Sequence, residues 1–558
     1  MRRRRGVRRT APVGLTTAGA TDAVRPASRE ETFPVAIASV VLGFIALIIS
    51  FSRGYLLLYG DAVAHLGIAR RILDSRNPGL SQLGGVWLPL PHLLMLPFIQ
   101  KMEWWQNGLA GTWPSLLCYI LGVMGFYRLA RRVMAPSWSF AATTFYALNP
   151  NLLYLATTAM TEPLFLAILI WGALLTMECV AAIRAGSFAL VRRRQIYLAL
   201  LVIAAVYTRY DGWIFGAAVW AMVSWRLFAA RKEQPQLWGN VASYYVVFTL
   251  LAAAAPLGWL AYNQHFFHDP LDFMRGPYSA VAIDRKTTPP GSPHYPGWHD
   301  PWRALMLYTR TAQLVAAAGE TGYAVMAASL AGLVILLRRR SEWPAVLLWV
   351  PLPFYVYSIA YGSVPIFIPP LWPHSYYNSR YGMEMLPALA VSAFVALAWG
   401  ARRLSASQPL LARILYPVSL SLAVFNSVAM MYKVPLVLKE SMVNSTTRVA
   451  FETALAHNLS SIPAGVPILM YSSDHIGAVQ QAGLPLRQFL NEYDRDSWNA
   501  ALAAPADKAA YVVALAGDPV SKAVEAHPEG LTELTVLCTT GQPCARIYQS
   551  DRFATLTR

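Results

Sequence analysis

Residues 59–98 read YGDAVAHLGIARRILDSRNPGLSQLGGVWLPLPHLLMLPF, and they decide the fold of the chain. They follow an apolar segment, 33–51, so that the first acid of the stretch, Asp61, stands where the chain leaves the bilayer. Asp61 and His65 are spaced i, i+4 and share one face if the stretch is helical. This pattern predicts an acidic group held just above the hydrocarbon, where it can act on a lipid-anchored substrate.

The helix predicted over 62–75 carries apolar residues together with charges, among them Arg70 and Arg71. This composition favours a helix that lies at the membrane surface, with the two arginines facing solvent or lipid headgroups, and contact of this pair with a phosphate group stays open. Pro-Gly at 78–79 ends the helix, and the segment WLPLPH, which ends at His92, returns the chain toward the membrane.

The composition indicates a polytopic membrane protein. The chain has 558 residues, of which 56% are hydrophobic and only 13% are charged, and its apolar stretches are long and separate. The formal net charge of +17 could suggest nucleic acid, but the basic residues fall in short clusters between the apolar stretches. This is the positive-inside pattern of membrane proteins, so we expect no nucleic-acid partner.

Because a span needs about 20 apolar residues, the sequence predicts about eleven transmembrane helices. They are expected at 33–52, 113–131, 138–158, 163–183, 195–209, 212–229, 241–261, 321–338, 343–362, 383–400 and 411–431. With a cytoplasmic N-terminus, every strong basic cluster then falls on the cytoplasmic side. The loops on the other side carry aromatics, prolines, histidines and isolated acids, as expected of an enzyme site or a transporter vestibule.

Three regions are predicted along the chain. Residues 1–32 are expected to be a disordered, basic, cytoplasmic N-terminus, and 33–431 an all-α bundle in the membrane. The tail, 432–558, is less apolar and alternates strand-like with helix-like runs, which predicts a small extracytoplasmic α/β domain. Cys538 and Cys544 lie close together in the tail and can form a disulfide if it is extracytoplasmic.

Several motifs, by their order and sidedness, resemble those of GT-C glycosyltransferases, especially protein O-mannosyltransferases and lipid A aminoarabinose transferases. The resemblance covers most of residues 33–431. After the acid that follows the first span, its motifs are PLPHLLMLPF (89–98), YRLARRV (127–133), NPNLLYLATTAMTEPLF (149–165), YTRYDGW (207–213) and NSRYGMEMLPAL (378–389). The resemblance implies that Asp61 and Glu162 match the two loop acids of the family. Because Ala62 follows Asp61, the chain lacks an acidic pair there, and the need for a divalent cation stays open.

The resemblance also implies the reaction, which is transfer of a sugar from a polyprenyl-phosphate donor to a lipid, protein or glycan acceptor. The transfer is expected to be inverting and to occur at the extracytoplasmic boundary of the inner or plasma membrane. Such chemistry needs a base to deprotonate the acceptor, and Asp61 is the candidate, although it can also serve only as the N-cap of the following helix. Glu162 is costly between two apolar spans unless it is used or paired, but it can also merely mark a helix start. His65 can orient Asp61, bind a cation or simply lie at the interface.

A leaving phosphate is best held by arginine, whose planar fork binds two oxygens. Arg380, at headgroup height beside a tyrosine-rich run, is the first candidate, with an interfacial anchor as its alternative role. Arg209 and Asp211 are expected to pair with each other. The other candidates for substrate binding are Tyr377, His374, Arg275 and His92.

Two other functions stay open at this level. A transporter or flippase of lipid-linked saccharides predicts inverted repeats and charges near the bilayer midplane, whereas most charges here lie outside the predicted spans. A noncatalytic assembly protein would leave Asp61 and Glu162 far apart. An enzyme would instead place both carboxylates in one extracytoplasmic cavity, with an arginine near a lipid-sized groove.

Overall fold

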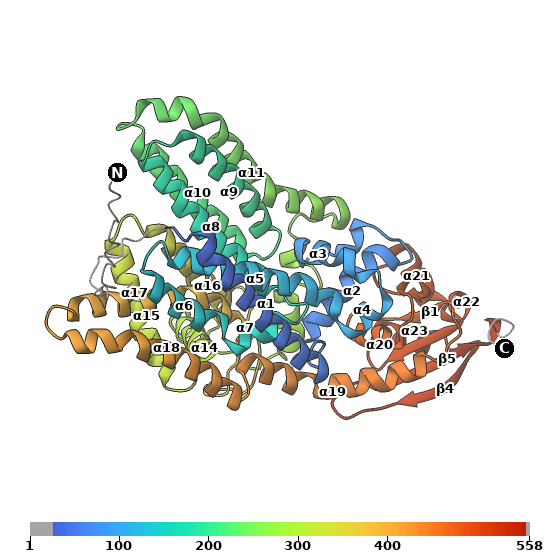
Figure 1. The fold of residues 1–558 in the computed structure, drawn as a ribbon. Coiled ribbons are helices and arrows are strands. Elements are labelled where there is room, and N and C mark those ends of the chain that lie inside the picture. Colours follow the sequence, from blue (N-terminus) through green and yellow to red (C-terminus); the bar gives the residue numbers. More distant parts are fainter. Residues whose placement is uncertain (1–25, 554–558) are drawn as a thin grey trace, which may run out of the picture.

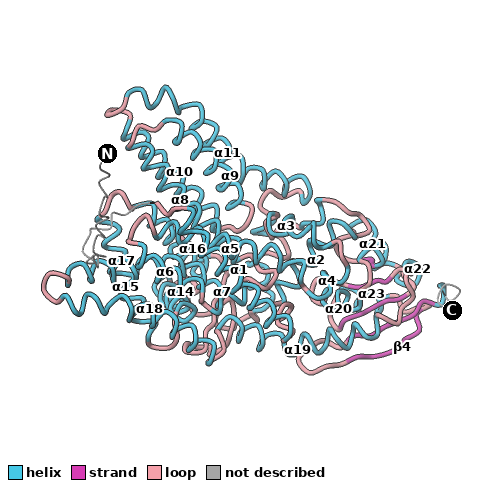
Figure 2. The backbone as a smooth tube through the Cα atoms, in the orientation of Figure 1, coloured by secondary structure: helices cyan, strands magenta, loops and turns pink. Residues whose placement is uncertain are grey.

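The computed structural model of the chain describes residues 26–553 and consists of two parts (Figure 1). Long helices make up the larger part, and all five strands of the described chain lie between Ile468 and Ser550 at the C-terminal end (Figure 2). Most of the predicted N-terminal segment, residues 1–25, lies outside the described residues. The first helix begins at Arg29 behind a capping box formed by Ser28 and Glu31.

Nine helical segments of the described chain are long and apolar enough to cross a membrane, which confirms the predicted polytopic helical class. They are α1 (Arg29–Ser52), α5 (Leu109–Ala130), α8 (Glu162–Arg184), α10 (Asp211–Ala230), α11 (Pro235–Phe267), α15 (Thr321–Arg338), η2 with α16 (Trp343–Trp349 and Pro351–Tyr361), η3 with α17 (Ser379–Met385 and Leu386–Leu404), and α18 followed by α19 (Pro409–Tyr432 and Leu436–Leu459). Each segment overlaps one predicted span.

The predicted span 138–158 is divided in the structure into α6 (Pro136–Ala147) and α7 (Pro150–Leu155). The division arises because the side chain of Asn149 accepts two backbone N–H groups as the cap of a new helix, whose first residue is a proline.

The predicted span 195–209 corresponds to α9 (Phe188–Val206), which begins earlier and includes the three arginines at 192–194. Because these three charges lie within it, α9 is not among the helices that are apolar enough to cross a membrane. The predicted number of about eleven spans is therefore not confirmed, and nine are found by length and composition in the described chain.

The helix predicted at the membrane surface is α2 (Gly60–Asp74), and most of its residues are buried against other parts of the protein. Arg70 pairs with Asp74 at 2.8 Å. The guanidinium carbon of Arg71 lies 3.4 Å from the ring centroid of Tyr493 in the C-terminal part. The expectation that both arginines face solvent or headgroups is therefore wrong, because the C-terminal part covers this helix.

Short elements complete the connections between the long helices. They are η1 (Leu80–Leu83), α3 (Leu90–Ile99), α4 (Met102–Asn107), α12 (Asp272–Arg275), α13 (Ala280–Thr287) and α14 (Pro301–Ala316). The predicted long loop 262–320 is mostly structured, since α11 extends into it and α14 fills its second half.

The C-terminal part is a five-stranded sheet with helices around it, which confirms the small α/β region predicted for the tail. The strand order is β2-β1-β3-β5-β4, with parallel pairing among the first three strands and antiparallel pairing of β5 with β3 and β4. The strands are β1 (Ile468–Met470), β2 (Phe489–Leu490), β3 (Tyr511–Leu515), β4 (Leu531–Leu537) and β5 (Ala545–Ser550). The remaining elements are α20 (Ile476–Ala482), η4 (Leu486–Gln488), α21 (Arg495–Ala503), α22 (Pro505–Lys508), α23 (Pro519–Ala526) and η5 (Asp551–Phe553).

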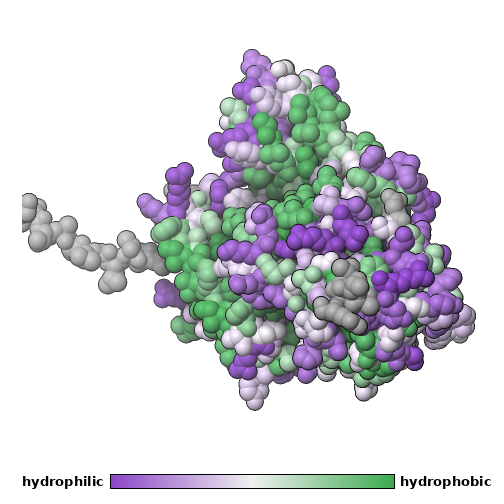
Figure 3. Space-filling model, turned by 90° about the vertical axis from the view of Figure 1, so that its right-hand side faces the viewer, coloured by the Kyte–Doolittle hydropathy of each residue, from purple (hydrophilic) through white to green (hydrophobic). Residues whose placement is uncertain are grey.

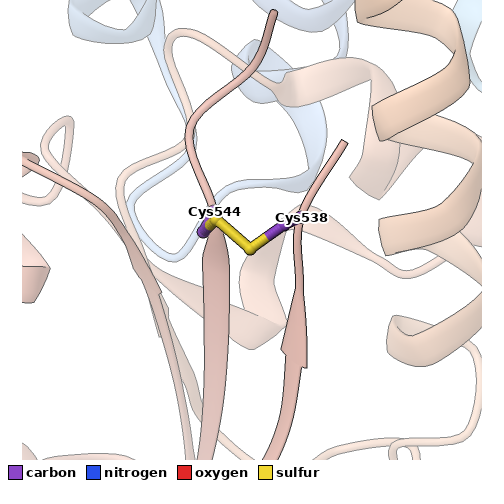
Figure 4. The surroundings of a disulfide bond; sticks show 2 residues. All are labelled: Cys538 and Cys544. Atoms are coloured by element: carbon purple, nitrogen blue, oxygen red, sulfur yellow. A yellow bond between two sulfur atoms is a disulfide. The ribbon is translucent and has the colours of Figure 1, made fainter. Parts of the chain in front are cut away.

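The end of the molecule formed by this sheet has the features of a water-facing domain. Hydrophilic residues cover much of it in a view onto that end (Figure 3). Cys538 and Cys544 form the disulfide that the sequence left possible, and it joins the end of β4 to the start of β5 (Figure 4). α19 connects the two parts of the molecule, because it packs against α7 and η3 of the helical part and against α20 of the C-terminal part.

Candidate active site

The turn between α1 and α2 holds Asp61 in the first turn of α2. The N-cap of this helix is Tyr59, so Asp61 does not have the capping role considered from the sequence. The hydroxyl of Tyr59 donates a hydrogen bond to the carbonyl oxygen of Val437 in α19 at 3.0 Å, which fixes the turn. The side chain of Asp61 remains 41% exposed.

The guanidinium of Arg380 joins acids from three distant parts of the chain. It forms an ion pair with Asp61, and its Nε lies 3.2 Å from Oε1 of Glu162. Its Nη1 lies 3.6 Å from Oε1 of Glu440, and Oε2 of Glu440 accepts a hydrogen bond from the backbone N–H of Ser379 at 2.7 Å. Elements α2, α8, η3 and α19 therefore meet around one arginine.

A second arginine, Arg209, lies on the other side of Glu162. Its Nη1 is 3.5 Å from Oε1 of Glu162, and its Nη2 is 3.1 Å from Oε1 of Glu384. Its Nε is 3.5 Å from Oδ2 of Asp211, which is the pairing expected from the sequence. The hydroxyl of Tyr355 accepts from Nη2 of Arg209 at 2.6 Å and donates to Glu384 at 2.7 Å.

Two guanidinium groups thus connect five acids, which we call the carboxylate cluster. Its members are Asp61, Glu162, Asp211, Glu384 and Glu440. Four of the five side chains are at most 1% exposed, and Asp61 is the exception. Neither oxygen of Glu162 has a hydrogen-bond partner among residues 26–553. Buried charges of this kind persist where they are paired or used, and only Asp61 in the cluster is open to a substrate from outside.

The carboxylate cluster lies at one boundary of the helical part. Glu162 and Asp211 stand in the first turns of α8 and α10, where the helix dipoles favour negative charge, and Glu384 lies in η3, two residues before the start of α17. The opposite ends of α8 and α17 carry arginines, Arg184 among them. We call these two ends the site face and the basic face. Since α8 and α10 both begin at the site face, α9 must return the chain between them, and it packs against both.

His65 lies one turn along α2 from the ion-paired acid and contacts His92 at the start of α3. Nδ1 of His65 and Nε2 of His92 are 2.8 Å apart, and the ring of His65 stacks on Trp87 with centroids 4.3 Å apart. Burial, followed by the positive charges of Arg380 and Arg209, lowers the pKa of His65 to about 3. His65 is therefore neutral near pH 7 and supports the start of α2 as an uncharged group.

The other predicted substrate-binding residues lie around the cluster or away from it. Tyr377, two residues before η3, is half-exposed, and burial followed by the negative charge of Asp61 raises the pKa of its phenol. His374 is exposed on the same loop, and its Nδ1 lies 2.8 Å from a backbone carbonyl oxygen there. Arg275 pairs with Asp269 at 2.6 Å on an exposed surface. The structure therefore brings together Asp61, Glu162, Arg380 and Tyr377, with the two histidines behind them, and leaves His374 and Arg275 outside.

Glu384 and Glu440 were missed by the sequence reasoning, together with Tyr355 and the central position of Arg209. Glu384 is the only acid in the segment 378–389, and an apolar stretch follows it directly in the sequence. An acid in this position is costly unless it is used or paired, so this position was a signal that could have identified Glu384. Glu440 gave no such signal, because it lies in the tail beyond the last predicted span.

No group of three or more His, Cys, Asp or Glu side chains within residues 26–553 is arranged to hold a metal ion. The acids of the carboxylate cluster contact guanidinium groups instead.

Comparison with known proteins shows the fold. No protein-family model and no curated protein sequence matches the chain. The crystal structure of ArnT from Cupriavidus metallidurans bound to undecaprenyl phosphate is similar, with a TM-score of 0.54, 13% sequence identity, and coverage of 93% of this chain and 98% of that chain. The apo structure of the same protein gives a TM-score of 0.51 and 13% identity, and the match covers 92% of this chain and 97% of that chain. The chain therefore has the fold of ArnT, a GT-C aminoarabinose transferase, as the sequence resemblance implied.

Proposed function

We propose that the chain is a membrane glycosyltransferase that moves a sugar from a polyprenyl-phosphate-linked donor to an acceptor on the extracytoplasmic face. The observation that carries this proposal is that Asp61 is 41% exposed while its partner, Arg380, is anchored by the fully buried Glu162. An accessible carboxylate held by a rigid support is the arrangement that a general base needs. The presence of undecaprenyl phosphate in a structure of the same fold supports a lipid-linked donor.

The proposed reaction is a single displacement with inversion at the anomeric carbon. The acceptor oxygen or nitrogen attacks this carbon while the Asp61 carboxylate takes the acceptor proton, and the bond between the carbon and the phosphate oxygen breaks. The ion pair to Arg380 uses Oδ2 of Asp61, which leaves Oδ1 for the acceptor. The products are the glycosylated acceptor and free polyprenyl phosphate.

Glu162 and Glu440 act in this proposal as positioning residues for Arg380. They face two of its three nitrogen atoms, so the donor phosphate is proposed to approach the guanidinium from the side of Asp61. Tyr377 is half-exposed beside this approach and is proposed to contact the substrate. Substrate contacts of His374 and Arg275 stay predictions.

The lipid part of the donor is proposed to lie in an apolar groove of about 500 Å³ formed by α14, α15, η2, α16 and the end of η3. Met385, the neighbour of Glu384 in the chain, belongs to its lining. Others that line it are Trp302, Met306, Met326, Leu330 and Leu352. A polyprenyl chain in this groove would end near the carboxylate cluster.

Two observations favour an enzyme over the other functions considered. Asp61 and Glu162 contact the same guanidinium, that of Arg380. The hypothesis of a noncatalytic assembly protein predicted that these two acids lie far apart. The buried acids stand at helix starts on one face, whereas a flippase would need charges near the midplane.

The proposal is tested with purified full-length protein in lipid vesicles and a panel of radiolabelled polyprenyl-phospho-sugars, with a membrane extract as the source of acceptor. Release of polyprenyl phosphate together with label on an acceptor supports transfer. Label that crosses the bilayer but stays on the lipid would identify a flippase and contradict the proposal. Protein-free vesicles serve as the control.

A further inference from the structure

A second cavity lies on the basic face, far from the carboxylate cluster. It has a volume of about 510 Å³ and is lined by the end of α5, the last turns of α8 and the turn before η2. α8 runs 23 residues from Glu162 to Arg184, which is about 33 Å at about 1.5 Å per residue. The cavity is therefore separated from the site by about the thickness of a bilayer core.

Guanidinium groups outnumber carboxylates around this cavity. Glu178 already contacts Arg132 at 2.8 Å and Arg194 at 2.6 Å. Glu342 contacts Arg339 at 3.2 Å. Both acids near the cavity are thus neutralised by neighbours within the chain.

Arg184, which lines the cavity, has no acidic partner among the described residues. Its Nη2 donates to the carbonyl oxygen of Arg340 at 3.0 Å, and the positive charge of Arg226 acts on its guanidinium. Nε of Arg226 is buried and has no hydrogen-bond partner in residues 26–553. Like charges repel each other, and an anion bound beside Arg184 would offset this repulsion.

We propose that this cavity binds an anionic phospholipid through its phosphate. Arginine holds phosphate oxygens through paired N–H groups, and basic cavities between membrane helices on this side suit such headgroups. Arg184 and Arg132 supply the contacts to the phosphate, and Met177 and Ala181 form an apolar wall for the carbon chain next to it. Inorganic phosphate could make the same contacts with the arginines, but it has no apolar part that would pack against Met177 and Ala181.

The test uses the full-length protein in detergent, with native mass spectrometry for lipid retention and thermal unfolding for stability. Phosphatidylglycerol, phosphatidylcholine and inorganic phosphate are added separately. We expect phosphatidylglycerol to be retained in preference to phosphatidylcholine and to raise Tm, and inorganic phosphate to have little effect. Equal retention of the two lipids would overturn the site, and an equal effect of inorganic phosphate would overturn the assignment to a lipid.

Variants then locate the binding. Arg184→Gln should lower the apparent affinity for phosphatidylglycerol about fivefold, as expected for one arginine at a membrane surface. Arg193→Gln is the matched control, because Arg193 is exposed near the basic face and does not line the cavity. Unchanged affinity in Arg184→Gln would contradict the proposal. If this variant does not fold, Arg132→Gln, at the other arginine that lines the cavity, replaces it with the same expectation.

Discussion

Arg380 and Asp61 form an ion pair although 319 positions separate them in the chain. The pair joins the first turn of α2 to η3. Through Glu162 and Glu440 the same guanidinium also reaches α8 and α19. The support of the proposed base is thus assembled from four elements, and it depends on the charge and shape of one side chain.

Replacing Arg380 by lysine should abolish most sugar transfer while the protein still folds. Lysine keeps the positive charge, but its ammonium cannot contact three carboxylates in the planar geometry of a guanidinium. We expect kcat to fall at least about 100-fold, since small displacements of a catalytic group have effects of this size. The measurement is steady-state transfer of radiolabel by protein that elutes as a single species.

Arg380→Met is the companion variant that separates charge from geometry. It leaves Glu162 and Glu440 buried without this partner, which should cost about 3–5 kcal/mol of stability. Transfer by Arg380→Lys at more than half of the wild-type rate would contradict the positioning role.

Glu440→Gln should lower kcat about tenfold with little change in KM, because Glu440 acts on Asp61 through Arg380. The amide can still accept the Ser379 hydrogen bond, but it loses the charge that holds the guanidinium. Glu452 is the matched control, since it lies on the same helix, is also buried and pairs with Arg448 at 2.6 Å. Glu452→Gln should lower Tm and leave kcat unchanged, and equal losses of kcat in both variants would refute a specific role of Glu440.

The sequence was sufficient to predict the class of fold because apolar length and basic sidedness are local signals. Asp61 and Glu162 could be proposed as partners through their positions at the ends of spans. The sequence could not predict that Arg380 contacts both Asp61 and Glu162, because residue spacing along the chain does not reveal an ion pair between distant helices. It also misassigned Arg70 and Arg71, because a charged strip looks solvated until the domain that covers it is known.

The sequence also could not predict that Glu440 belongs to the site. A boundary drawn at the last apolar span separates α19 from the membrane part, whereas in the structure α19 contacts both parts. A hydrophobic signal marks where a span ends, and it does not say which later segment packs back on it.

The buried pair His65 and His92 should make the protein sensitive to acid. Burial, followed for His65 by the charges of Arg380 and Arg209, lowers the pKa of His65 to about 3, and the pKa of His92 is also lowered, chiefly by burial. Because the unfolded chain then binds more protons below about pH 6.5, stability should fall as the pH drops from there toward 3. His65 contributes a slope of up to about 1.4 kcal/mol per pH unit in this window, and His92 acts in the same direction.

This prediction is checked by measuring the free energy of unfolding as a function of pH, between about pH 4.5 and 6.5. His65→Gln should have a shallower slope than wild type by about one proton, and its pH dependence above about pH 7 should be unchanged. An identical slope in the variant would show that His65 is not a buried neutral group.

Glu178→Gln should destabilise the protein without affecting transfer in the folded fraction. Glu178 is buried on the basic face and contacts Arg132 and Arg194, so its loss leaves these guanidinium groups without their acid. A loss of about 3–5 kcal/mol is expected for breaking a buried pair. The exposed Glu30, near the same face, offers the control Glu30→Gln, which should stay within about 0.5 kcal/mol of wild type. A wild-type Tm in Glu178→Gln would contradict this account of the basic face.

The most direct measurement is the rate of sugar transfer by Asp61→Asn. Arg380 keeps Glu162 and Glu440 in this variant, so folding and membrane insertion should match the wild type, as judged by Tm and by yield. Asparagine cannot accept the acceptor proton, and transfer of label from polyprenyl-phospho-sugar should fall at least about 100-fold. Transfer at the wild-type rate by Asp61→Asn would contradict the assignment of Asp61 as the base.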